Sequence, residues 1–443
     1  MTTIEAQPFY LQGAFAPVAD EVTAFDLPVT GAIPPELAGR FLRNGPNPRA
    51  GDPGHWFFGD GMVHGIELRD GRASWYRNRY VRTPSFDEGR ALVGEDGMLD
   101  PSVCVANTNV IGHAGRIFAL VENSLPTEMD GELGTVGPYD FAGQLDTAMT
   151  AHPKECPLTG ELHFFGAGFF PPFLTYHVAD ASGKLVRSEV IDVPAGTMAH
   201  DFAITEHWAI FMDLPVVFDW RMLKAGTMPY RWSDEHEARI GLLSRTEPGA
   251  AVRWFPVEPC FVFHVLNAAE RSETGIEIDV VRYPELWRES PLVIGPATLH
   301  RWSVDLAAGS LTEAPLDDRP VEFPRVDDRR TGLPHRYGYA VGTVARPDGI
   351  DVDPVLAKYD LATGVTEVHD FGPGHSPGEG VFVPAADEAA EEEGYVVTYV
   401  YDAARNGSDL VILDATDFTG PPVATVALPQ RVPLGFHGNW LPD

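Results

Sequence analysis

Short runs of β-branched and aromatic residues, separated by Gly, Pro, Asn and Asp, recur along the chain and predict many short β-strands. Residues 66–69 and 73–76 flank Asp70–Gly71, a dipeptide that favours a two-residue hairpin turn. Helix signals are few: residues 215–230 hold a candidate short helix, and the acidic residues 385–393 are typical of a solvated loop. Further strands are predicted at residues 110–111, 116–121, 208–212, 260–264, 276–281, 395–400 and 410–413.

A weak internal repeat lies within this strand pattern. Residues 176–183, 302–309 and 359–364 each read as a strand, an Asp, a tight Gly turn and the start of a return strand. Repeated hairpins through one long chain favour a β-propeller, because radial repetition leaves only short, protected sheet edges. Ordinary hairpins of a β-sandwich or a barrel fit the repeat about equally well. The pattern therefore predicts an all-β chain without choosing its architecture.

Composition restricts the kind of protein this chain forms. Of its 443 residues, 44% are hydrophobic and 11% aromatic, which is enough for a sizeable core rather than a disordered chain. Lys and Arg total 32 against 64 Asp and Glu, and the net charge of −32 argues against nucleic acid as a partner, because phosphate would be repelled. A soluble, highly charged surface is the simplest explanation of this charge.

The cysteines and the N-terminal residues bear on the compartment. Cys104, Cys156 and Cys260 are odd in number and show no CxxC spacing, so a disulfide framework is not expected and a reducing compartment fits. Residues 1–15 have neither the basic start nor the apolar stretch of a secretory signal. No run approaches the roughly 20 apolar residues that span a bilayer. We expect a soluble, cytoplasmic protein.

Four of the 15 histidines stand out by their surroundings. His152 and His200 follow Ala, and His264 and His437 follow Phe, so each polar ring lies in an apolar setting and needs a partner. Their separations of 48, 64 and 173 residues exclude a metal site on one helix and suit a site where distant strands converge. A lone His is more often an ordinary hydrogen-bonding residue, and spacing alone does not distinguish the two.

Several motifs, in this order, resemble those of the carotenoid cleavage oxygenase family, and the resemblance extends from about Gly39 to Trp440. They are Phe41–Pro48, His55–Gly65, Ala151–Lys154, His200–Thr205, Phe263–His264 with Asn267–Ala268, and Phe436–Gly438. The resemblance implies an all-β, seven-bladed β-propeller with an axial iron site and a cap of loops and short helices. We expect residues 1–443 to form this single domain, with residues 1–38 as an N-terminal extension that packs on the propeller.

The same resemblance assigns residues to an iron site. It implies that Fe(II) is bound by His152, His200, His264 and His437. It places glutamates behind three of these rings, with Glu122 supporting His200, Glu322 supporting His264 and Glu379 supporting His437, and it leaves His152 without a carboxylate. Solvated surface acids are the alternative for the glutamates. Thr108 matches the threonine beside the open coordination position and is the candidate catalytic residue; an ordinary strand threonine is its alternative.

The expected activity follows from the family. It is cleavage of a conjugated C=C bond of a carotenoid or apocarotenoid by Fe(II) and O2, with two carbonyl products. Phe57, Val121 and Phe436 are the candidate substrate contacts, and residues 169–173 are a candidate entrance or membrane contact, with core packing as the alternative. Members that cleave lignostilbene-type phenols have a lysine where this chain has Val121, which favours a polyene. A lignostilbene or phenylpropanoid oxygenase and, more distantly, a non-enzymatic propeller that binds a partner are the other hypotheses.

Overall fold

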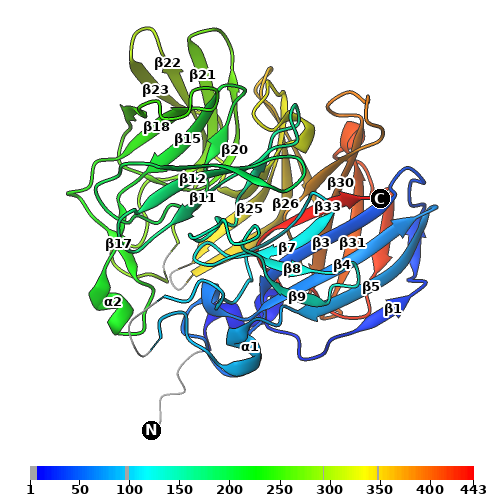
Figure 1. The fold of residues 1–443 in the computed structure, drawn as a ribbon. Helices are drawn as coiled ribbons and strands as arrows, with labels where there is room; N and C mark the ends of the chain where they lie inside the picture. The colour runs from blue at the N-terminus through cyan, green and yellow to red at the C-terminus, as the bar shows by residue number, and fades with distance from the viewer. Residues whose placement is uncertain (1–6, 95–98, 293, 347–348) are drawn as a thin grey trace.

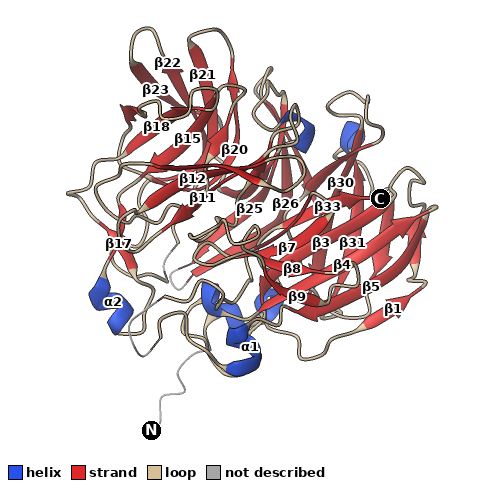
Figure 2. Cartoon of the chain, in the orientation of Figure 1, coloured by secondary structure: helices blue, strands red, loops and turns tan. Residues whose placement is uncertain are grey.

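A computed structural model describes residues 7–94, 99–292, 294–346 and 349–443, so residues 1–6 of the predicted N-terminal extension lie outside the described part. Strands dominate the described chain, and helices are short and few (Figure 2). In the described residues, seven sheets of four to six strands surround a common axis, with an eighth, two-stranded sheet beside them. The predicted all-β fold and its seven-bladed propeller are confirmed.

The blades follow one another in chain order, and in each blade the strands named first lie nearest the axis. Blade 1 contains β33 (Gly438–Pro442), β3 (Gly39–Pro46), β4 (Gly61–Arg69), β5 (Arg72–Tyr80) and β1 (Thr23–Phe25). Blade 2 contains β6 (Asn109–His113), β7 (Arg116–Leu120), β8 (Thr127–Met129) and β9 (Thr135–Pro138). Blade 3 contains β10 (Lys154–Glu155), β11 (Leu162–Ala167), β12 (Leu174–Ala179) and β13 (Leu185–Val190). Blade 4 contains β14 (Ala203–Ile204), β15 (Trp208–Asp213), β18 (Arg239–Ser244) and β19 (Arg253–Pro256).

The remaining blades and the elements outside them complete the chain. Blade 5 contains β20 (Phe261–Glu270), β21 (Gly275–Tyr283), β22 (Thr298–Asp305) and β23 (Ser310–Pro315). Blade 6 contains β24 (Val321–Arg325), β25 (Tyr337–Arg346), β26 (Gly349–Asp360) and β27 (Val365–Asp370). Blade 7 contains β28 (His375–Pro377), β29 (Val381–Pro384), β30 (Gly394–Asp402), β31 (Gly407–Asp414), β32 (Ala424–Ala427) and β2 (Val29–Gly31). The two-stranded sheet pairs β16 (Val216–Phe218) with β17 (Tyr230–Trp232). The described helices are α1 (Pro84–Glu88) and α2 (Trp220–Lys224). The described 3-10 turns are η1 (Phe9–Leu11), η2 (Gly13–Phe15), η3 (Trp56–Phe58), η4 (Asp328–Arg330) and η5 (Ala415–Asp417).

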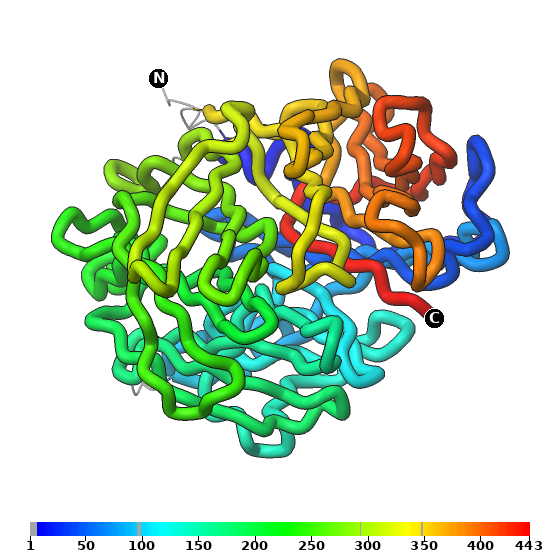
Figure 3. Tube along the Cα trace, turned by 90° about the horizontal axis from the view of Figure 1, so that it is seen from above, coloured from blue at the N-terminus to red at the C-terminus, as the bar shows by residue number. Residues whose placement is uncertain are grey.

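The ring is closed by strands from both ends of the chain. Seen from above, the colour runs once around the molecule, and the C-terminal segment lies beside the first blade (Figure 3). There β33 pairs with β3, with Phe41 opposite Trp440. At the outer edges, β1 pairs with β5 in blade 1 and β2 pairs with β32 in blade 7. Closure therefore depends on contacts between the two ends of the sequence.

Local sequence explains the individual hairpins. Asp70 and Gly71 both have positive φ, 51° and 70°, as the two-residue turn between β4 and β5 requires. The three repeat segments are the outer hairpins β12–β13, β22–β23 and β26–β27 of blades 3, 5 and 6, which confirms the predicted repeat. The predicted helix is α2, within the β16–β17 insertion of blade 4, and residues 385–393 form a loop, as predicted.

The core is a ring of apolar clusters between neighbouring blades rather than one central mass. Strand β20 near the axis is buried along nearly its whole length, whereas the outer strand β13 alternates between buried and exposed residues. Phe41 of blade 1 packs on Tyr399 of blade 7, with ring centroids 5.0 Å apart. Because such clusters fix the blades against each other, the inner strands are held rigidly around the axis. No helix in the described residues is long and apolar enough to cross a membrane.

Candidate metal centre

Four histidines converge near the axis at the inner ends of their blades. His152 lies just before β10, His200 just before β14, His264 within β20 and His437 just before β33. One ring nitrogen from each lies within 4.8 Å of the others, and all four residues are buried. The Nε2 atoms of His152 and His200 are 3.0 Å apart, and those of His200 and His264 are 3.3 Å apart. The structure thus brings together four side chains that the sequence separates by up to 285 positions.

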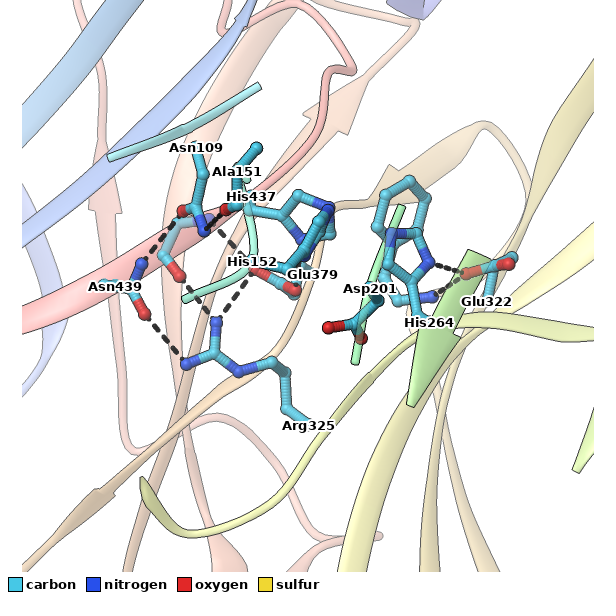
Figure 4. Close-up of polar contacts among 12 residues, drawn as sticks. Asn109, Ala151, His152, Asp201, His264, Glu322, Arg325, Glu379, His437 and Asn439 are labelled. Carbon is cyan, nitrogen blue, oxygen red and sulfur yellow. Dashed lines mark hydrogen bonds and ion pairs between the residues drawn. The ribbon is translucent and has the colours of Figure 1, made fainter. Parts of the chain in front are cut away.

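Three glutamates lie behind three of these rings, in the pairs expected from the sequence. Glu322 Oε2 lies 2.5 Å from Nδ1 of His264, and Glu379 Oε1 lies 2.9 Å from Nδ1 of His437 (Figure 4). Glu122 Oε1 lies 2.9 Å from Nδ1 of His200, although the angle at this contact is unfavourable for a hydrogen bond. The described residues place no carboxylate within ion-pair distance of His152.

Every blade supplies one member of this cluster. The contributions, from blade 1 to blade 7, are His437, Glu122, His152, His200, His264, Glu322 and Glu379. Blades 3, 4 and 5 supply histidines in succession, and the fourth histidine arrives with the C-terminal strand that closes the ring. The cluster is therefore complete only when the propeller is closed.

Burial and pairing set the protonation of these groups. Burial would lower the pKa of His264, but the charge and hydrogen bond of Glu322 outweigh it and raise that pKa. Burial, assisted by the neighbouring histidines, lowers the pKa of His437 to about 4 despite Glu379. Burial and the same neighbours hold the pKa of His152 well below its usual value. Burial opposes ionisation of Glu322, yet its contacts with His264 lower its pKa, so it remains a carboxylate.

The hydrogen-bond arrangement fits a bound cation. A carboxylate accepts hydrogen bonds only, so Nδ1 of His264 and Nδ1 of His437 each donate. When Nε2 of either ring is deprotonated, as metal binding requires, it presents a lone pair. These lone pairs point into one buried space, where unpaired acceptors are costly. Nitrogens about 3.0 Å apart match two imidazoles bound to one ion at roughly 2.1 Å. Imidazole donors suit Zn, Cu, Fe and Ni among the transition metals.

An apolar cavity of about 60 Å³ adjoins one side of the cluster. The predicted Phe57, Val121 and Phe436 line it, together with Thr108. The Thr108 hydroxyl donates to Asn107 Oδ1 at 3.1 Å, and its carbonyl accepts from the backbone N–H of His437 at 3.1 Å. Further lining residues that sequence reasoning missed are Trp56, Phe263, Tyr283, Ile294, Phe323 and Ile350. Of these, Phe263 could have been predicted from the sequence, because it directly precedes the candidate metal ligand His264.

Short aromatic contacts build the wall of this cavity. Phe57 and Phe436 meet edge to face with centroids 5.4 Å apart, and Trp56 covers Phe436 at 4.6 Å. The N-terminal segment packs behind them, with Phe15 5.3 Å from Trp56. Such a wall excludes water and binds apolar groups by area and shape. Residues 169–173 lie elsewhere: Phe170 is 53% exposed and packs on Trp220 of α2.

A larger cavity of about 720 Å³, bordered by several charged side chains, lies along the axis on the other side of the cluster. His152, His264 and His437 border it, as do Lys154, Asp201 and Arg325. Lys154 Nζ lies 2.7 Å from Asp201 Oδ1, so this ion pair joins blades 3 and 4 beside the histidines. The four histidines therefore lie between a small apolar cavity and a larger one that charged side chains border.

Replacing Glu322 with glutamine is expected to weaken metal binding by roughly 10–100-fold, because partners of metal-bound imidazoles contribute about this much. Glutamine keeps the volume but removes the charge that holds His264. Glu155→Gln is the matched control, since Glu155 pairs with His113, outside the cluster, at 2.8 Å. Titration of the metal-free variants with a divalent ion measures the effect. Unchanged affinity in Glu322→Gln would remove Glu322 from the centre.

Comparison with known proteins adds to this geometry. The RPE65 family model, described as retinal pigment epithelial membrane protein, matches residues 15–442. A carotenoid cleavage oxygenase of Mycobacterium tuberculosis is 40% identical, and the match covers all of both chains. The crystal structure of a Pseudomonas brassicacearum lignostilbene dioxygenase is 31% identical, with a TM-score of 0.89 over 99% of each chain. That of cobalt-substituted Synechocystis apocarotenoid oxygenase is 29% identical, with a TM-score of 0.84 over 96% of this chain and 97% of the other.

Proposed function

The chain belongs to the carotenoid cleavage oxygenase family, to which the RPE65 model applies, and from this premise we propose that it cleaves a conjugated C=C bond of a carotenoid or apocarotenoid. One molecule of O2 is consumed, each of its oxygen atoms ends on one of the two former alkene carbons, and two carbonyl products are released. The observation that carries the proposal is the set of four converging histidines beside an apolar cavity.

We assign the metal as Fe(II), bound by His152, His200, His264 and His437. Zinc also accepts four imidazoles but has no redox chemistry, and reaction with O2 needs a metal that can exchange electrons. When bound, Fe(II) supplies the activation of O2. Four neutral imidazoles would leave the charge of a bound Fe(II) at two plus. Glu122, Glu322 and Glu379 orient three of the rings.

The remaining residues of the site bind and orient the substrate. Phe57, Val121 and Phe436 hold the polyene beside the histidines and keep water out. Thr108, which lines the apolar cavity, would lie beside a bound metal, and its backbone carbonyl holds the His437 N–H. No side-chain acid or base is required, because the reaction adds two oxygen atoms and moves no proton to or from the substrate.

Val121 favours a polyene over a phenolic substrate. It borders the apolar cavity next to Glu122, and no lysine is found among the described residues that line this cavity. A phenolate would need a cation there, whereas a polyene needs only apolar surface. The 40% identical relative is named a carotenoid cleavage oxygenase, which agrees with this choice. The lignostilbene dioxygenase neighbour makes a phenylpropanoid oxygenase the second candidate.

We further propose that the chain acts in the cytoplasm as a single propeller domain completed by residues from the N-terminal extension. Cys104, Cys156 and Cys260 are buried, unbridged thiols, which suits a reducing compartment. β1 and β2 add strands to blades 1 and 7, which supports one folding unit. The net charge of −32 opposes nucleic-acid binding. Phe170 and Trp220 are the proposed points of peripheral membrane contact.

A substrate panel tests the activity. Iron-loaded protein is incubated with carotenoids, apocarotenoids, phenolic stilbenes and isoeugenol-type alkenes, and the product masses are determined. We expect carbonyl fragments from a polyene, and none from the His264→Ala variant used as the matched control. Cleavage of phenolic stilbenes alone would support the second candidate. No turnover of any compound by iron-loaded protein would support a non-enzymatic binding propeller.

A further inference from the structure

Arg325, at the end of β24 in blade 6, contacts the metal centre from the axial cavity (Figure 4). Its Nη1 lies 3.3 Å from Glu379 Oε2 and donates to the carbonyl of Gly438 at 2.8 Å. Glu379 Oε2 also accepts from the Gly438 backbone N–H at 2.9 Å, while Oε1 faces His437. One guanidinium therefore fixes both the carboxylate behind His437 and the backbone that follows it.

The second terminal nitrogen of Arg325, Nη2, begins a series of hydrogen bonds through two side-chain amides. Nη2 donates to Asn439 Oδ1 at 2.9 Å, and Asn439 Nδ2 donates to Asn109 Oδ1 at 3.0 Å. Asn109 Nδ2 then donates to the carbonyl of Ala151 at 2.8 Å, one residue before His152 (Figure 4). The chain thus runs from blade 6 through blades 1 and 2 to the turn that carries His152.

His152 is the ring that no carboxylate contacts among the described residues, so its orientation must come from its backbone. Two contacts hold that backbone. Thr150 Oγ1 accepts from the His152 N–H at 3.1 Å and donates to the His200 carbonyl at 3.1 Å, while Asn109 holds Ala151. Thr150 is fully buried and Asn109 is 7% exposed, so water does not compete for these bonds.

Charge gives Arg325 a second role. The three glutamates carry three negative charges in a buried site, and a divalent ion would neutralise two of them. Among the described residues, Arg325 is the one Lys or Arg within ion-pair distance of any of the three. Its charge opposes the third negative charge, and an unbalanced buried charge is costly; the guanidinium also pairs with Asp328, whose exposed carboxylate lies 3.2 Å away in solvent.

We propose that Arg325, Asn439 and Asn109 are positioning residues of the metal centre: the guanidinium neutralises and orients Glu379, and the amide chain fixes the turn of His152 in place of a carboxylate. This inference rests on the proposed metal function. The chain links blades 6, 1 and 2 to blade 3 across the point where the propeller closes. It therefore couples closure of the ring to the geometry of two of the four histidines.

The test is the affinity of the metal-free full chain for Fe(II), titrated without O2 and without substrate. Arg325→Met, which keeps the bulk but removes the charge and the fork of donors, is expected to weaken binding by roughly 10–100-fold. Arg325→Lys keeps the charge and should recover part of the loss, and Asn109→Ala should weaken binding by about 10-fold. Arg329→Met is the matched control, because Arg329 borders the same cavity but bonds to Asp327 and the 386–389 loop.

Thermal unfolding of the metal-free variants separates positioning from general stability. We expect Arg325→Met and Arg329→Met to lose similar metal-free stability, with only Arg325→Met losing affinity. Equal affinity of Arg325→Met and the unmodified chain would overturn the inference, and so would an equal loss in Arg329→Met. If Arg325→Met fails to fold, Asn109→Ala and Arg325→Lys decide the question in the same way. Failure of the unmodified chain itself to bind Fe(II) would instead overturn the proposed function.

Discussion

Replacing His264 with alanine is expected to abolish metal binding and, with it, cleavage of the double bond. His264 is one of the four clustered histidines: its Nε2 is 3.3 Å from that of His200, and its ring centroid is 4.7 Å from that of His437. Loss of a residue that hydrogen-bonds to a metal-bound histidine lowers metal affinity about 10–100-fold. Loss of the histidine itself should therefore lower metal affinity by more than roughly 100-fold. Metal content after purification and product formation from a polyene are the two measurements.

The substitution has a second consequence because Glu322 would remain behind the missing ring. A buried carboxylate without its partner is strongly destabilising. Glu322 would keep the Tyr283 hydroxyl at 2.6 Å and the Phe323 N–H at 2.6 Å, so the fold should survive at lower stability. His300→Ala is the control, since His300 lies on β22, outside the cluster, and its imidazole forms a hydrogen bond with the Thr298 hydroxyl at 3.0 Å. Full activity in His264→Ala would exclude a four-histidine centre.

Much of the fold follows from local sequence, and the closure of the ring does not. The β4–β5 turn needs only Asp70–Gly71, and the outer hairpins of blades 3, 5 and 6 appear as a repeat, because both are interactions between neighbours in the chain. The pairing of β33 with β3 joins residues about 400 positions apart, so no local pattern encodes it. The architecture was instead indicated by the resemblance of ordered motifs to a family.

The residues of the site likewise fall into those that the sequence indicates and those that only the structure shows. The four histidines lie in the ordered motifs, and the family resemblance names them together with the three glutamates, whereas their long separations in sequence do not give their arrangement in space. Arg325, Asn109 and Tyr283 were missed, because each acts through a contact with another blade or strand and nothing in its neighbouring residues marks it. A buried polar residue is recognised only when its partner is known. Contacts between blades are therefore the part of this site that sequence reasoning could not supply.

Removing the metal with a chelator is expected to abolish activity and to lower the unfolding temperature of the chain. Every blade contributes to the cluster, and His437 arrives on the segment that leads into the closing strand β33, so a bound ion stabilises the closed ring. Metal present at about 100 times its dissociation constant adds roughly 2.7 kcal/mol to the free energy of unfolding. For a chain of 443 residues this corresponds to a shift of about 3 °C.

Restoring different metals separates the two roles of the ion. Fe(II) should restore both activity and thermal stability, whereas Zn(II), which four imidazoles also bind, should restore stability alone because it has no redox chemistry. The His264→Ala variant, treated in parallel, should show no thermal shift with either ion. Activity regained with Zn(II) would refute the assignment of redox chemistry to the metal. A thermal shift that persists in His264→Ala would place the stabilising ion outside the four histidines.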